Sequence, residues 1–125
     1  MINGFEKETQ PLTEAEKKLL PLFIKGFYNR WGRENQVTNK QIQKGFAEKG
    51  YKVPDSRVRK IINFIRSECI IPDLMADNGG YYRTKDAAKL RTYIESMRQR
   101  AYSFLSVADK MENHLNKSEQ NDKQC

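Results

Sequence analysis

A short basic stretch, residues 54–67, most constrains the fold of this chain. Its apolar residues recur at intervals of three and four, which predicts a helix with one side in a core: Val58, Ile61, Ile62 and Ile65. The opposite side is polar and cationic, with Ser56, Lys60, Asn63 and Ser67 flanked by Arg57, Arg59 and Arg66. A helix that reads a DNA major groove needs this division. An ordinary amphipathic helix with a solvated basic face has the same pattern, so the neighbouring segments must decide.

Capping boxes predict where two earlier helices begin. Thr13 and Glu16 have the spacing of a cap and its reciprocal partner, and Thr38 and Gln41 repeat it. The first helix is expected to extend to about residue 28, with a kink or a break at Pro21. The second is expected to extend to about residue 49, and to be followed by a short turn into the basic helix. That helix is expected to take Pro54 as its first residue.

A strand, a tight turn and a second strand follow the basic helix. Residues 69–76 are expected to form the first strand, 77–80 the hairpin turn and 81–84 the second strand. Tyr81 and Tyr82 must point to opposite faces, one into the core and one outward. Two short helices and a hairpin in this order predict the helices and wing of a winged helix-turn-helix.

The last segment carries an uninterrupted heptad pattern. Its apolar residues alternate at spacings of four and three over about 26 residues, or about 39 Å of helix: Leu90, Ile94, Met97, Ala101, Phe104, Ala108, Met111 and Leu115. We refer to these eight residues as the seam. A seam this long predicts a homodimer; the alternative is that its first half packs on the first helix of the same chain. Residues 116–125 are polar and are expected to be disordered.

Composition narrows the class of partner. The net charge is +7 and the pI about 9.5, which favours a polyanion. Residues 86–125 carry seven basic and six acidic side chains, so the excess charge lies earlier in the chain. Two cysteines and one histidine do not make a metal site, and no cofactor or small-molecule substrate is expected. No membrane span or signal peptide is visible, so we expect the reducing cytoplasm of a bacterial host cell.

Four runs resemble a known group of proteins: LTEAEKKLLPLFIKGF, VTNKQIQKGFAEKGYKV, RVRKIINFIR and IPDLMADNGGYY. They are similar to small winged helix-turn-helix proteins of phages and mobile elements of Bacteroidetes-type bacteria, over residues 12 to about 110. The resemblance implies DNA binding and carries over no active site. Such proteins often have serine before the basic helix, where this chain has Pro54, a change that affects the cap and not the polar face.

The predicted fold class is therefore mainly α. We expect a flexible arm over 1–11, a winged helix-turn-helix domain of three helices and a β-hairpin over 12–85, a coiled-coil-like oligomerisation helix over 86–115 and a disordered tail over 116–125. The predicted function is that of a phage or mobile-element regulator of transcription or replication, not an enzyme, because no nucleophile–base pair or phosphate loop is present.

The predicted interface with double-stranded DNA centres on Lys60 and Asn63, which are expected to meet base edges. Phosphate contacts are expected from Arg57, Arg59 and Arg66. The start of the second helix is expected to contribute Thr38, Asn39 and Lys40, and the base of the wing Arg83 and Lys85. Ser56 completes the predicted set. A dimer would require a two-fold repeated site, with half-sites one helical turn or a multiple apart. The alternative is a winged-helix protein-interaction module whose basic face is only solvated. The two differ in whether Arg57, Lys60, Asn63 and Arg83 line one continuous positive surface.

Overall fold

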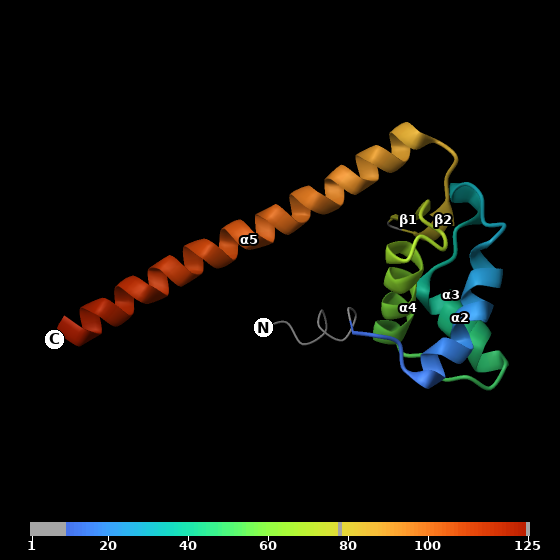
Figure 1. The fold of residues 1–125 in the computed structure, drawn as a ribbon, viewed down its shortest axis with the longest axis horizontal. Helices are drawn as coiled ribbons and strands as arrows, with labels where there is room; N and C mark the ends of the chain where they lie inside the picture. The colour runs from blue at the N-terminus through green and yellow to red at the C-terminus, as the bar shows by residue number, and fades with distance from the viewer. Residues whose placement is uncertain (1–9, 78, 125) are drawn as a thin grey trace. The chain divides into compact units, whose positions relative to one another are not determined.

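The structure, a computed structural model, describes residues 10–77 and 79–124 and is mainly helical (Figure 1). The chain divides near residue 87 into two units. The first contains the helices α2 (Glu14–Phe27), α3 (Asn39–Glu48) and α4 (Asp55–Ser67), a short 3-10 turn, η1 (Arg33–Asn35), and a hairpin of β1 (Leu74–Asp77) and β2 (Gly80–Arg83). The second is a single helix, α5 (Ala87–Gln124).

Both predicted capping boxes are confirmed. The backbone N–H of Glu16 donates to Thr13 Oγ1 at 3.2 Å, and the N–H of Thr13 donates to Glu16 Oε1 at 2.8 Å. At the start of α3, the same exchange joins Thr38 and Gln41 at 3.1 and 2.9 Å. Each box satisfies two backbone donors that a helix start would otherwise leave unpaired.

The predicted break at Pro21 is wrong, because α2 continues through it. Proline removes one backbone hydrogen bond of the helix. Leu19, Phe23 and Phe27 lie on one buried face on both sides of Pro21, which is itself exposed. Packing of that face keeps the two halves in one helix, since burial of several large side chains outweighs one missing hydrogen bond.

The core forms where α4 packs against α2 and α3. The apolar face predicted for α4 is confirmed: Val58, Ile61, Ile62 and Ile65 are all buried. Pro54 is the N-cap of the helix and not its first residue, with an extended backbone. Its carbonyl accepts the N–H groups of Arg57 and Val58, so the helix begins without a side-chain cap.

The chain reverses direction after α4 through a left-handed residue. Cys69 has a φ of 56°, and the N–H groups of Cys69 and Ile70 donate to the carbonyls of Arg66 and Ile65. This is the hydrogen-bond pattern of a Schellman motif, which usually has glycine at the left-handed position. The first strand therefore begins at Leu74 and not at residue 69 as predicted. The apolar residues before it mislead, because Ile71 is buried without being in a strand.

The hairpin has the predicted turn and gains a third segment. Asp77 pairs with Gly80, so the turn contains two residues, of which Asn78 lies outside the described residues. On the other side of β2, Val37 exchanges both backbone hydrogen bonds with Tyr81, at 3.0 and 2.8 Å. Gly80 permits this approach, because a Cβ there would collide with the Val37 carbonyl oxygen. The connector between α2 and α3 therefore flanks β2.

Tyr82 is buried, as predicted for one tyrosine of the pair, but the other, Tyr81, does not face outward, because it packs against the core. Tyr82 is fully buried, whereas Tyr81 is half-buried and contacts the ring of Phe27 edge-on. Because consecutive strand residues point to opposite faces, the ring contact with Phe27 shows that the Tyr81 face of β2 lies against the helices.

Helix α5 is longer than predicted. It begins at Ala87 and runs to Gln124, so the described residues 116–124, expected to be disordered, continue the helix. Asn, Lys, Glu and Gln, which make up most of this segment, are compatible with a helix, and no proline or glycine interrupts it. Among the described residues, no helix combines the length and apolarity that crossing a bilayer requires.

We expect the Ile61→Ala variant to lose roughly 2–5 kcal/mol of unfolding free energy, because the deleted groups leave a cavity in a site with no solvent contact. Ile70→Ala is the matched control: its side chain is 39% exposed, and its loss should stay near or below about 1 kcal/mol. Urea denaturation measures both. Equal losses would show that α4 presents a different face to the core.

Candidate nucleic-acid interface

The structure places Lys60 inside the protein and not on its surface. Its ammonium group donates to Glu16 Oε1 at 2.7 Å, and the two side chains are only 10% and 4% exposed. The prediction that Lys60 reads a base edge is therefore wrong. Periodicity assigned it correctly to the polar side of α4, but the first turn of α2 lies against that edge of the helix and supplies an anion.

Glu16 also forms an ion pair with Arg57, a second residue that was predicted to contact DNA. Arg57 Nε lies 3.2 Å from Glu16 Oε2, so one carboxylate faces two cations from α4. Burial alone would raise the pKa of Glu16, but the hydrogen bonds from Lys60 and from the Thr13 backbone outweigh it and hold the pKa below its usual value of 4.5. Glu16 is therefore ionised in the fold, and it neutralises charge that the sequence assigned to DNA.

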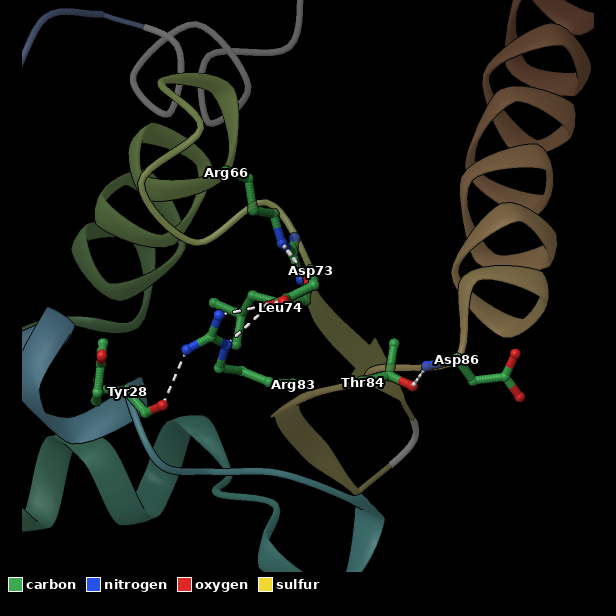
Figure 2. Close-up of polar contacts among 7 residues, drawn as sticks. All are labelled: Tyr28, Arg66, Asp73, Leu74, Arg83, Thr84 and Asp86. Atoms are coloured by element: carbon green, nitrogen blue, oxygen red, sulfur yellow. Dashed lines mark hydrogen bonds and ion pairs between the residues drawn. The ribbon is translucent and has the colours of Figure 1, made fainter.

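Arg83 joins the hairpin to the end of α2 (Figure 2). Its guanidinium donates to both Asp73 carboxylate oxygens, at 2.7 and 3.1 Å, and to the Tyr28 carbonyl at 2.9 Å. It also stacks 4.1 Å from the centre of the Trp31 ring. A planar guanidinium suits such a combination of bidentate and stacking contacts. Arg83 is thus an internal anchor, and the guanidinium that was predicted to contact DNA is engaged within the fold.

Two further predicted cations lie beside this anchor. Lys85 is exposed, and its ammonium lies 4.9 Å from the centre of the Trp31 ring, on which Arg83 also stacks. Arg66 donates from Nε to the Leu74 carbonyl at 2.9 Å, which ties the end of α4 to β1 (Figure 2). Its guanidinium also lies over the Tyr81 ring, 5.9 Å from its centre. Arg66 thus supports the hairpin, whereas Lys85 remains at the surface.

Four polar residues of α4 remain accessible beside these internal contacts: Ser56, Arg59, Asn63 and Ser67. We refer to them as the exposed face of α4. All but Asn63, which is half-buried, are exposed. The face lies beside the start of α3, because Asn39 Nδ2 donates to Asp55 Oδ1 at 2.6 Å. Of the predicted α3 contacts, Lys40 is exposed, while Thr38 and Asn39 are half-buried at the cap. The structure thus brings these two predicted groups together.

Asp55 and Tyr81 belong to this region and were missed as site residues. Asp55 Oδ2 lies 2.9 Å from Arg59 Nη1, so the acid restrains a cation of the exposed face. Burial raises the pKa of Tyr81 above its usual value of 10.0, partly opposed by the charge of Arg66. The i,i+4 spacing of Asp55 and Arg59 was a visible signal. The position of Tyr81 depended on strand pairing.

The continuous positive surface that would have favoured DNA binding over protein interaction is therefore not formed by Arg57, Lys60, Asn63 and Arg83. Glu16 pairs with the first two and Asp73 with the last. Within the described residues, no three His, Cys, Asp or Glu side chains cluster as a metal site would need. Comparisons with protein families, with curated proteins and with solved structures gave no match.

We expect the Glu16→Gln variant to lose about 3 kcal/mol of unfolding free energy at neutral pH, because it leaves Lys60 buried without an anion while keeping the oxygen that caps α2. The pKa of Glu16 is lower in the folded state, so its contribution is complete above 4.5 and disappears as the pH falls through the folded value. The difference in unfolding free energy between the parent and the variant should therefore become smaller as the pH falls.

Glu14→Gln is the control for this experiment, since it removes an 87% exposed carboxylate from the same helix turn. It should change the unfolding free energy by less than about 0.5 kcal/mol at neutral pH. Denaturant titrations between pH 3 and pH 7 make the comparison. A gap for Glu16→Gln that stays constant or widens in acid would contradict the assigned role.

Proposed function

We propose that this protein binds double-stranded DNA with the exposed face of α4, as a winged helix-turn-helix protein. The observation that carries the proposal is the composition of that face: a guanidinium, an amide and two hydroxyls lie along one helix, with no large apolar side chain among them. The layout of α3, α4 and the following hairpin supports it, as does the net charge of +7.

The proposed contacts follow from which side chains remain accessible. Asn63 and Arg59 face the bases, since an amide pairs with adenine and a guanidinium with guanine in the major groove. Lys40 and Lys85 contact phosphates on either side, together with backbone N–H groups at the start of α3. Arg57, Lys60 and Arg83 are left out, because acids within the fold bind them.

We further propose that two copies associate through α5 and act on one DNA as a regulator of transcription or replication in a phage or mobile element. The support for the dimer is the exposure of the seam, considered below. Two copies of α4 on one duplex would double the contacts with a repeated site and would raise its affinity over a single site.

One observation favours a second function, a protein-interaction module without DNA binding. Three of the predicted DNA contacts are engaged within the fold, and Asp55 is paired with Arg59 at the centre of the remaining face. In that case the exposed face is only solvated, and α5 provides the functional surface. Loss of DNA binding on mutation of the exposed face distinguishes the two.

We expect Arg59→Ala and Asn63→Ala each to weaken binding to a duplex selected from random sequences by about 1–3 kcal/mol at fixed salt, because each removes a base contact. Lys25→Ala is the control: it removes the same charge as Arg59→Ala from an exposed position of α2, away from its buried face. Fluorescence anisotropy measures binding. If the parent enriches no sequence, or if both variants bind like the control, the second function is favoured.

We expect Asp55→Asn to tighten binding to mixed-sequence duplex by about 1 kcal/mol at low salt, since it removes the carboxylate beside Arg59 and keeps an acceptor for Asn39. The gain should shrink as salt screens the charges. Asp109→Asn makes the same charge change on exposed α5 and should have little effect. Unchanged affinity in Asp55→Asn would place the DNA elsewhere.

A further inference from the structure

Seven of the eight seam residues are exposed along one unbroken helix, and the eighth, Leu90, is half-buried. Ile94, Met97, Phe104, Met111 and Leu115 have exposed fractions from 40% to 74%, and Ala101 and Ala108 between them are exposed as well. An apolar row of this length on a helix is typical of an association surface. The order of large and small residues along the row restricts the partner to which it can be complementary.

Large and small residues are divided between the two core positions of the heptad. Leu90, Met97, Phe104 and Met111 occupy one position, d, and the other, a, includes Ala101 and Ala108. In a parallel pair of copies, equivalent residues face each other, so Phe104 would meet Phe104 and Ala101 would meet Ala101. Crowded and empty layers would then alternate, whereas a well-packed core sets large residues against small ones.

An antiparallel pair removes this mismatch, because each a residue then faces a d residue of the other copy. One register gives every seam residue a seam partner: Leu90 with Leu115, Ile94 with Met111, Met97 with Ala108, and Ala101 with Phe104. Both alanines then face large residues. A shift by one heptad would set Ile94 against Ser118 and would leave Leu90 without a seam residue opposite it.

The charges beside the seam favour the same orientation. The e positions of the heptad carry, in order, Arg91, Arg98, Leu105, Glu112 and Glu119, all exposed. In an antiparallel pair the e positions of the two helices share one edge in opposite order, so arginines face glutamates. In a parallel pair e faces g, where Tyr93, Arg100, Val107 and His114 would offer no arginine–glutamate pair.

We infer that α5 binds α5 of a second copy of this chain in antiparallel orientation, with Met97 opposite Ala108 and Ala101 opposite Phe104. The inference rests on the proposed dimer and not on DNA binding. It specifies an interface whose two edges differ. Arginine–glutamate pairs at the e positions stabilise one edge, while the g positions place tyrosine, arginine, valine and histidine along the other.

Disulfide trapping tests the orientation in full-length protein with Cys69→Ser and Cys125→Ser as background. Met97→Cys is prepared in one sample and Ala108→Cys in another. Antiparallel helices place the two cysteines opposite each other only when both variants are mixed, exchanged and oxidised. In either variant alone, equivalent positions would lie about 16 Å apart along the axis, too far for a disulfide, which needs Cα atoms within about 7 Å.

We expect dimers by sedimentation equilibrium and cross-links in the mixture up to the statistical limit for random pairing, with none in either variant alone. Cross-linking of Ala108→Cys by itself would overturn the orientation and leave the dimer in place. A dimer that cross-links in no sample would overturn the register. A mass of 14.7 kDa at tens of micromolar would overturn the proposed dimer itself, whereas a failure of DNA binding would appear only in anisotropy.

Discussion

The carboxylate of Glu16 decides which side of α4 meets the solvent. It lies in the first turn of α2, 44 residues before Lys60, and draws that lysine and Arg57 toward itself. A buried lysine without an anion would cost several kcal/mol, so the pair must form wherever α2 and α4 pack in this way. The exposed face of α4 is consequently narrower than its sequence indicates, and the DNA contact proposed for this helix centres on Arg59 and Asn63.

A second constraint fixes the hairpin. Arg83 spans from Asp73 to the Tyr28 carbonyl, 55 residues away in sequence, and stacks on Trp31. Together with the backbone bonds between Val37 and Tyr81, it ties β2 to the connector between α2 and α3. A two-stranded hairpin is marginal by itself, so these contacts hold it against the connector, while Arg66 ties β1 to the end of α4.

The helix boundaries were largely predictable, because their signals are local. Thr13 with Glu16 and Thr38 with Gln41 identify two helix starts within four residues of sequence, and Gly50 marks a helix end through its left-handed backbone. The end of α4 was less predictable. Cys69 takes the conformation that glycine usually adopts, so the composition gave no sign of a turn before the first strand.

Sequence alone determined the period of each helix and therefore its apolar side: the isoleucines of α4, which are buried, and the seam of α5, which is exposed, both follow from spacing. Only the tertiary structure decided which polar residues stay accessible. Lys60, Arg57 and Arg83 carry the charges expected of a DNA interface, but Glu16 and Asp73 neutralise them from distant positions. The physical reason is that periodicity records how a helix divides apolar from polar, whereas the pairing of a charge depends on which other segment folds against it.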